Sequence, residues 1–313
     1  MTATMVIVGA GPVGRHTAQL LAERGDEVVV VTRSGRGPEL DGVRRVAADA
    51  SDADALTGLT TGARALFNCA NPADYTTWDQ VWPPLAESLL QAAERTGATL
   101  VTASSLYGYG PVDGPMVEGQ PDRATDHKGR LRAGMWAQAR ARHEAGRLHA
   151  VEVRGSDYVG EGVGANGHVP RQVPGALAGR AAWMIGRTDV PHTWTDVADM
   201  ARTLVAVADR PDVWGQVWHA PSNEPRSQRQ ALTEVLAAAG HGPVPVHGVP
   251  APALRAAGLF SPLMRELAQL SYIFTRPYVM DSAHTQQVLA LAPTPWAQVC
   301  RRTVTGSSEP ARA

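Results

Sequence analysis

The stretch MVIVGAGPVGRHTAQLLAERGDEVVVV, residues 5–31, decides the fold of this 313-residue chain. Met5–Val8 is an apolar run that predicts a buried strand, and Glu27–Thr32 predicts a second, as a parallel sheet covered on both faces requires. Between them, apolar residues at helical spacing predict a helix that continues over Arg15–Arg24 and ends at Gly25. A strand, a helix and a strand in this order predict an α/β fold with a doubly wound parallel sheet.

A glycine-rich turn, Gly9-Ala10-Gly11-Pro12-Val13-Gly14, joins the first strand to the helix. In this context Gly9 would form the tight turn, Gly11 would let the backbone approach a pyrophosphate, and Gly14 would let the helix pack closely on the strand. The first helical turn, which contains Pro12 and Val13, offers free N–H groups and a positive dipole end to the phosphates. The alternative is an ordinary tight turn, but the flanking elements favour a Rossmann-type dinucleotide site.

The end of the second strand bears on which dinucleotide binds. An NAD site carries Asp or Glu there for the ribose 2′-hydroxyl, whereas an NADP site supplies arginine for the 2′-phosphate. Here the sequence is Thr32-Arg33-Ser34-Gly35-Arg36, without an acid. Thr32, Arg33 and Arg36 therefore favour NADP(H), and the alternative is that both arginines are solvated loop charges.

Two more predicted strands, Val43–Ala48 and Ala65–Cys69, end in residues that suit a bound dinucleotide. An acid just after the first strand could hydrogen-bond an adenine amino group, although either this acid or Asp52 is expected to cap the following helix. Small residues after the second strand would let the dinucleotide approach the sheet edge. The candidate contacts are Asp49, Ala50, Ala70 and Asn71.

Composition limits the partners. The formal net charge of −1 and the pI near 6.8 give no electrostatic reason to expect nucleic acid or an anionic membrane surface. Cys69 and Cys300 form neither a disulfide framework nor a metal-ligand cluster. The sequence lacks an apolar span of membrane length and a leader pattern. We therefore expect a cytoplasmic protein with a small-molecule substrate and no metal.

The remaining pattern divides the chain into a sheet domain and a lobe. Strand and helix signals alternate up to Gly160, and Asp196 is expected to cap a helix that returns to the sheet domain. We expect the dinucleotide-binding domain at residues 1–160 with returning segments at about 190–222, the substrate lobe at 161–189 and 223–305, and a disordered tail at 306–313. Further helices are expected at 83–96, 127–147, 197–208, 227–239, 253–274 and 281–291, and strands at 99–103, 148–153, 181–185, 192–195 and 217–220.

A polar, glycine-rich loop, Ser104–Pro111, follows the fifth predicted strand, at the end where open α/β sheets bind ligands. The motifs that carry a family resemblance are the glycine turn, Asp49, Ser105-x-x-x-Tyr109-Gly110, Arg154–Gly160 and Thr195–Ala198. Nearly the whole chain resembles an extended short-chain dehydrogenase/reductase of the NAD-dependent epimerase/dehydratase family. The resemblance implies a doubly wound sheet, a small C-terminal substrate lobe and hydride transfer at C4 of nicotinamide. It also implies that the segment containing Tyr158 flanks the nicotinamide.

The chain departs from this family at the catalytic motif. Family catalysis rests on Tyr-x-x-x-Lys, in which the lysine and the nicotinamide ribose lower the tyrosine pKa. The chain has no such motif, and 23 residues after Ser105 it has Lys128-x-x-x-Arg132 instead. Arg132 could still hold the ribose hydroxyls. Lys128, away from water and beside a second cation, would give up its proton more readily than an exposed lysine.

Lys128 is the single lysine among 29 basic residues. Every other basic residue is arginine, so a lysine at this position indicates a role that needs a group able to lose its proton. The alternative is that Lys128 is a solvated charge at the start of a helix. Ser105 would donate a hydrogen bond to a substrate carbonyl, unless it merely caps its loop. Tyr109 and His127 are reserve candidates for proton transfer.

Three functions follow. The first is an atypical NADP(H)-dependent reductase or dehydrogenase for a small carbonyl or alcohol; the second is a non-catalytic NADP-binding sensor. The third is a sugar-nucleotide epimerase or dehydratase, with phosphate partners among Arg171, Arg180 and Arg187, unless these are solvated. The resemblance also implies a homodimer formed by the helices at 83–96 and 127–147, in which Met135 and Trp136 either anchor the contact or face the core.

Overall fold

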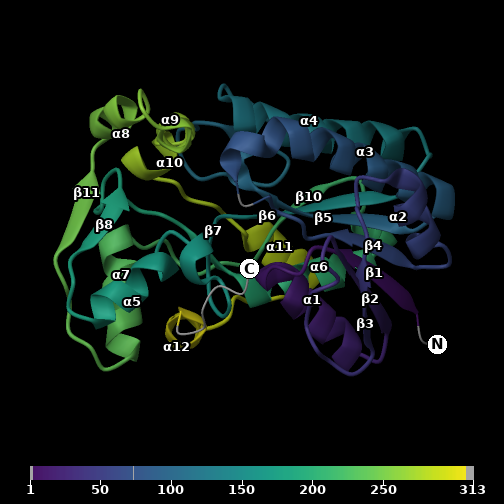
Figure 1. Cartoon of the computed structure of the whole chain (residues 1–313), viewed down its shortest axis with the longest axis horizontal. Helices are drawn as coiled ribbons and strands as arrows, with labels where there is room; N and C mark the ends of the chain where they lie inside the picture. Colours follow the sequence, from purple (N-terminus) through teal and green to yellow (C-terminus); the bar gives the residue numbers. More distant parts are fainter. Residues whose placement is uncertain (1–2, 73, 308–313) are drawn as a thin grey trace.

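A computed structural model of the chain describes residues 3–72 and 74–307. Its centre is a seven-stranded parallel sheet in the order β10-β6-β5-β4-β1-β2-β3 (Figure 1). The chain runs outward from β1 to β3 and then returns to β4 on the other side, which confirms the predicted doubly wound sheet. The strands are β1 (Thr4–Val8), β2 (Glu27–Thr32), β3 (Val43–Ala47), β4 (Ala65–Asn68), β5 (Thr99–Ser105), β6 (Ala150–Gly155) and β10 (Val217–His219).

Two hydrophobic cores lie on the two faces of this sheet. Because side chains alternate along a strand, Met5 and Ile7 of β1 enter one core, and Val6 and Val8 enter the other. Helices cover both faces, as a parallel sheet requires (Figure 1). The first face carries α1 (Pro12–Glu23) and α6 (Val197–Ala208), and the second carries α2 (Ala53–Thr60), α3 (Trp78–Thr96) and α4 (His127–Glu144).

The helix expected from residue 83 begins earlier. α3 starts at Trp78, after a 3-10 turn η1 (Tyr75–Thr77), so Pro83 and Pro84 lie inside the helix and not in its first turn. Trp78 and Trp82 are buried, whereas both prolines are exposed. Burial of two large aromatic side chains therefore outweighs the backbone hydrogen bonds that the prolines remove.

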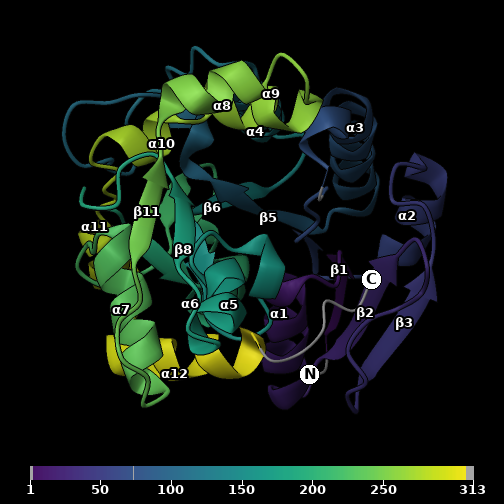
Figure 2. The same ribbon diagram turned by 60° about the vertical axis from the view of Figure 1, so that its left-hand side comes forward.

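A C-terminal lobe lies beside the carboxyl ends of the central strands, on the left in Figure 1. Its small parallel sheet of β8 and β11 packs against α5 and α7, and α8 and α9 continue above it (Figure 2). The lobe elements are α5 (Val173–Leu177), β8 (Ala182–Ile185), α7 (Gln228–Ala238), β11 (Val246–Val249), α8 (Ala251–Ala257), α9 (Pro262–Gln269), α10 (Tyr272–Thr275) and α12 (Trp296–Ser307). Between the two parts lie β7 (Asp157–Val159), β9 (Trp194–Asp196) and α11 (Ala283–Leu289), with 3-10 turns η2 (Leu106–Tyr109), η3 (Gly164–Asn166), η4 (Pro170–Gln172) and η5 (Pro211–Val213).

The chain ends differently from the expectation. The last helix expected, at 281–291, is α11, and α12 follows it. α12 includes Gly306 and Ser307, the first two residues of the expected tail, while residues 308–313 lie outside the described part. β-Branched residues and glycine made a helix here hard to predict. Val299, Cys300 and Thr303 are buried, and the first two belong to the lobe core. Their burial stabilises α12.

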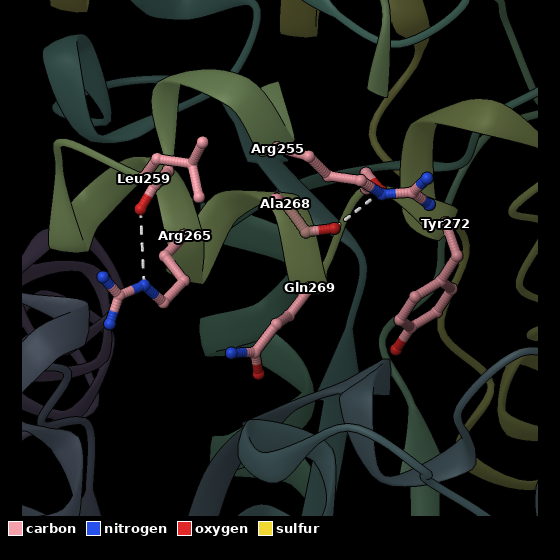
Figure 3. Close-up of a pocket in the computed structure, with 8 residues that line it drawn as sticks. Arg255, Leu259, Arg265, Ala268, Gln269 and Tyr272 are labelled. Carbon is pink, nitrogen blue, oxygen red and sulfur yellow. Dashed lines mark hydrogen bonds between the residues drawn. The ribbon is translucent and has the colours of Figure 1, made fainter. Parts of the chain in front are cut away.

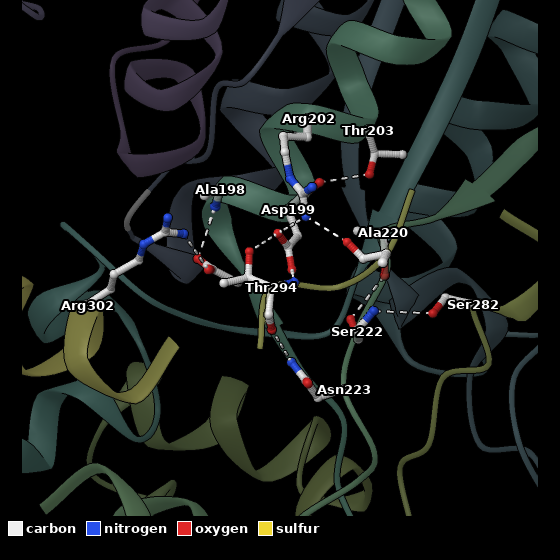
Figure 4. Close-up of polar contacts among 12 residues, drawn as sticks. Ala198, Asp199, Arg202, Thr203, Ala220, Ser222, Asn223, Ser282, Thr294 and Arg302 are labelled. Atoms are coloured by element: carbon white, nitrogen blue, oxygen red, sulfur yellow. Dashed lines mark hydrogen bonds and ion pairs between the residues drawn. The ribbon is translucent and has the colours of Figure 1, made fainter. Parts of the chain in front are cut away.

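Asp196 caps α6, as predicted, by accepting a hydrogen bond from the N–H of Ala198 at 3.1 Å. Its other oxygen lies 3.2 Å from Nη1 of Arg302, which belongs to α12 (Figure 4). The same carboxylate therefore starts a helix of the sheet domain and holds a helix of the lobe. Among the described residues, no helix is both long and apolar enough to cross a membrane.

Candidate functional site

The glycine turn after β1 requires glycine at two positions and is open at a third. Gly9 has φ +99°, and a Cβ atom on it would lie 2.8 Å from the Ala70 nitrogen. A Cβ on Gly14 would lie 2.1 Å from the carbonyl oxygen of Gly9, so only glycine lets α1 pack this close. At Gly11 a Cβ would meet nothing within 4 Å, which leaves the backbone open to a ligand.

The other predicted cofactor contacts follow the same edge of the sheet. Each of the first four strands has a predicted contact at its carboxyl end. The glycine turn follows β1, Thr32 is the last residue of β2, Asp49 follows β3 and Ala70 follows β4. Because these strands are parallel neighbours, their carboxyl ends meet at one edge. The structure thus brings together the residues that the sequence proposed for a dinucleotide.

At the β2 end of this edge, Arg33 and Arg36 are exposed. The hydroxyl of Thr32 donates to the carbonyl of Arg36 at 2.8 Å and so shapes the turn that carries both arginines. Hydrogen bonds from Ser51, together with the charge of Arg33, lower the pKa of Asp49. The positive charge of Arg33 thus acts on the carboxylate of Asp49, the predicted adenine contact.

Asp52, not Asp49, caps α2. Its carboxylate accepts the N–H groups of Asp54 and Ala55, both at 3.0 Å. The carboxylate of Asp49 accepts hydrogen bonds from Ser51, at 2.7 Å from the hydroxyl and 2.9 Å from the N–H. The alternative that Asp49 serves as the helix cap is therefore wrong.

Ser105 ends β5 opposite Gly155 of β6. Its hydroxyl oxygen is buried without a hydrogen-bond partner among the described residues, and it makes no capping bond. A Cβ on Gly129 would lie 2.5 Å from the Tyr107 carbonyl oxygen, so the start of α4 lies directly on the turn that follows Ser105. Ser105 does not cap its loop, and its donor is open to another group.

Lys128 is buried at the start of α4, with only 2% of its side chain exposed. Its ammonium contacts the carboxylate of Glu266, which belongs to α9 of the lobe. The Nζ atom also lies 5.5 Å from the ring centre of Tyr75 and 5.6 Å from that of Trp78. The alternative that Lys128 is a solvated charge is therefore wrong, and no local sequence pattern points to this carboxylate partner.

Arg132 lies one turn further along α4 and is also buried. Its Nε and Nη1 atoms have no hydrogen-bond partner among the described residues. Its guanidinium carbon lies 4.4 Å from the ring centre of Trp82. Burial lowers the pKa of Arg132, while the charge of Glu152 opposes this effect. Two buried, unpartnered N–H donors suit hydroxyl groups of a bound ribose.

Both reserve candidates for proton transfer already have polar partners in the structure. The hydroxyl of Tyr109 is bonded to Nε2 of His219 at 2.7 Å, and its ring lies 4.3 Å from the guanidinium carbon of Arg154. Burial raises the pKa of Tyr109. His127 is half exposed and contacts Asp79 at the surface. These contacts favour a structural role for Tyr109 and His127 over a role in proton transfer.

The structure adds a polar cluster around β7 that sequence reasoning missed. Asp157 contacts Nε2 of His192 at 2.8 Å. Burial opposes ionisation of Asp157, but the hydrogen bond to His192 and nearby positive charge outweigh it, so the pKa of Asp157 is lowered. The hydroxyls of Tyr75 and Tyr107 are 3.3 Å apart. These residues are far apart in sequence, so no local pattern joins them.

Tyr158 follows Asp157 in β7 and packs on the end of β6. A Cβ on Gly155 would lie 3.1 Å from the Tyr158 ring. Burial raises the pKa of Tyr158, so this phenol stays neutral. This position is compatible with the expected place beside the nicotinamide.

The three lobe arginines have different surroundings. Arg187 pairs with Asp189 at 3.0 Å. Arg180 is exposed and makes no side-chain hydrogen bond in the described part, whereas Nη2 of Arg171 lies 2.9 Å from Nδ1 of His168. The charge of Arg171 also lowers the pKa of Asp157. Only Arg171 therefore faces the cluster around β7.

A cavity of about 510 Å³ lies between α8, α9 and α10 (Figure 3). It is lined by Arg255, Gly258, Leu259, Arg265, Ala268, Gln269, Ser271 and Tyr272. None of the proposed site residues lines it, so we do not assign the substrate to it. The described residues contain no group of three or more His, Cys, Asp or Glu side chains that could hold a metal ion.

Comparisons with known proteins agree with this geometry. Residues 5–218 match the NAD dependent epimerase/dehydratase family. No curated protein sequence matches the chain. Solved structures share the fold: MoeE5 in complex with UDP-glucose and NAD is 20% identical, with a TM-score of 0.78 over 96% of this chain and 97% of that one. UDP-glucuronic acid 4-epimerase from Bacillus cereus in complex with NAD is 14% identical, with a TM-score of 0.78 over 97% and 98%. UDP-glucose 4-epimerase from Thermotoga maritima with UDP-glucose is 16% identical, with the same score and coverage.

Proposed function

The chain belongs to the NAD dependent epimerase/dehydratase family, and from this premise we propose that it is an NADP(H)-dependent oxidoreductase acting on a small carbonyl or alcohol. The observation that carries the proposal is the burial of Lys128 beside the Ser105 turn. A buried ammonium needs a charged partner, which Glu266 supplies, and Lys128 stands 23 residues after Ser105, where the resemblance puts the family's tyrosine.

The residues at the sheet edge fit a nicotinamide dinucleotide. The Gly9–Gly14 turn would receive the pyrophosphate, and Arg33 and Arg36 a 2′-phosphate. The unpartnered donors of Arg132 would hold the nicotinamide ribose. When bound in its reduced form, this cofactor would supply a hydride from C4.

The chain's own residues would manage the substrate oxygen. The open hydroxyl of Ser105 would donate a hydrogen bond to a carbonyl oxygen, and the Lys128 ammonium would give that oxygen a proton. The Glu266 carboxylate contacts this ammonium from the lobe. In the oxidative direction the same amine would accept the proton of an alcohol.

A second candidate is a sugar-nucleotide epimerase or dehydratase. The similarity to MoeE5 in complex with UDP-glucose and NAD extends over 96% of the chain and so includes the lobe. Arg171 beside Asp157 would then be the cation for a diphosphate. We place this function second because the chain lacks the tyrosine on which the family's reprotonation rests.

Mixing the protein with NADPH and a panel of carbonyls, including 2,3-butanedione and glyceraldehyde, tests the first function through nicotinamide absorbance. Absorbance loss supports it. NADPH binding without oxidation by any member of the panel would instead support the sensor. Stabilisation and conversion of UDP-glucose or UDP-glucuronic acid would support the second candidate.

The homodimer is also a proposal, with α3 and α4 as the contact. Trp136 is buried in the core, and Met135 packs against the same core, so neither anchors the contact. Exposed positions such as Pro83, Pro84 and Ala137 remain on the outer surfaces of the two helices. A monomeric mass at micromolar concentration would remove this proposal.

A further inference from the structure

The carboxylate of Glu266 connects the buried Lys128 ammonium to the surface of the protein. Its ammonium is almost fully buried, whereas 22% of the Glu266 side chain is exposed. α9 buries none of its residues, so the carboxylate reaches Lys128 from a helix that otherwise lies on the surface. Glu266 thus spans the distance from the buried amine to water.

The other neighbours of Lys128 do not carry a proton between its ammonium and water. The faces of Tyr75 and Trp78 cover it, and the Tyr75 hydroxyl is bonded to Tyr107. Arg132 does not release a proton at working pH. Asp74 is exposed and its Oδ1 accepts the N–H and hydroxyl of Thr76, but in the described part no hydrogen bond joins Asp74 to Lys128. In the part of the chain that the structure describes, Glu266 is the one group hydrogen-bonded to the Lys128 ammonium.

We propose that Glu266 is the residue through which Lys128 exchanges its proton with solvent. The inference rests on the proposed role of Lys128 as proton donor and adds a positioning residue from the lobe. After Lys128 has given one proton to the substrate oxygen, the Glu266 carboxylate takes one proton from water and passes it to Nζ. The ammonium and carboxylate are restored, and hydroxide remains in solution or is neutralised by buffer.

The single lysine makes this exchange directly measurable. A protein labelled with ¹⁵N and ¹³C in lysine gives one Nζ signal, which must belong to Lys128 if any tag is free of lysine. The rate at which its Nζ hydrogens exchange with water can then be read by NMR, without substrate or cofactor.

We compare the full-length protein with Glu266→Gln, which keeps the shape and removes the proton carrier. We expect exchange to slow by roughly tenfold or more. Glu266→Asp should recover part of the rate, and added acetate should accelerate exchange in Glu266→Ala. Gln269→Ala, an exposed change one turn along α9, is the control and should leave exchange unchanged.

Two results would overturn the inference. Faster exchange in Glu266→Gln would show that the ion pair shields Lys128, and an unchanged rate would show that protons reach it by another path. Neither result touches the proposed function, which is tested by carbonyl reduction. Conversely, slowed exchange in a protein that reduces no carbonyl would support the proton route while the proposed function fails.

Discussion

Thr294 donates two hydrogen bonds to the buried carboxylate of Asp199, one from its N–H at 2.7 Å and one from its hydroxyl at 2.6 Å (Figure 4). Asp199 belongs to the first turn of α6, and Thr294 lies between α11 and α12. Arg202 pairs with the same carboxylate from the solvent side. The contact ties the C-terminal segment to the sheet domain.

We expect Asp199→Ala to lower the free energy of unfolding by about 2–4 kcal/mol, because two buried donors of Thr294 lose their acceptor. Urea unfolding followed by circular dichroism measures the change. Asp212→Ala, an exposed change in a surface ion pair, is the matched control and should alter stability by less than about 1 kcal/mol. Equal effects of the two variants would contradict the structural role of Asp199.

The glycine turn predicts opposite outcomes for two similar changes. Gly14→Ala should destabilise or prevent folding, because the new methyl group meets the Gly9 carbonyl oxygen. Gly11→Ala should leave the melting temperature nearly unchanged but weaken NADPH binding by about tenfold or more, because the methyl group enters the open space meant for phosphate. Thermal melts and fluorescence titration separate the two. If Gly11→Ala binds NADPH normally, the turn does not hold the pyrophosphate.

Cofactor preference is expected to depend on Arg33. NADP(H) should bind at least about tenfold tighter than NAD(H), which corresponds to about 1.4 kcal/mol, because an arginine contact to the 2′-phosphate has no counterpart with the hydroxyl. Arg33→Asp should reduce or reverse the preference. Arg44→Asp, the same charge change on an exposed position of β3, is the control. Equal affinities of the unaltered protein for both cofactors would remove the assignment.

Lys128→Met is expected to lower turnover by roughly 10²-fold or more, because it removes the proton donor and keeps the side-chain length. NADPH affinity should change little. Lys128→Arg should fail almost as badly, since guanidinium keeps its proton. Stopped-flow absorbance with 2,3-butanedione measures both variants. Full activity of Lys128→Arg would show that only the positive charge matters and that Ser105 or water handles the proton.

Acid stability should report on His168. Burial, and next the charge of Arg171, lower the pKa of His168 to about 3. In the unfolded chain the pKa is about 6.5, so unfolding takes up a proton between these values and stability falls as pH falls from about 6.5 to about 3. The slope should approach about 1.4 kcal/mol per pH unit. His168→Gln should flatten the curve across this range in urea titrations, and an unchanged slope would contradict the buried neutral state.

The sequence alone determined the sheet domain, because its signals are local. Gly9, Gly11 and Gly14 act through backbone geometry within one turn, and apolar runs of four to six residues are enough to place buried strands. The spacing of Lys128 and Arg132 also places them one turn apart on the same face of α4. These features need no knowledge of distant segments.

Tertiary structure alone decided what surrounds these residues. Glu266 is 138 residues from Lys128 in the sequence, and no periodicity predicts that α9 would bring its carboxylate there. Likewise, the hydroxyl of Tyr109, a reserve candidate for proton transfer, is hydrogen-bonded to His219, which lies 110 residues further along the chain. Such contacts depend on how the lobe packs on the sheet domain. Burial and charge in the site are therefore properties of the folded chain, whereas the glycine turn after β1 is recognisable from the first fourteen residues alone.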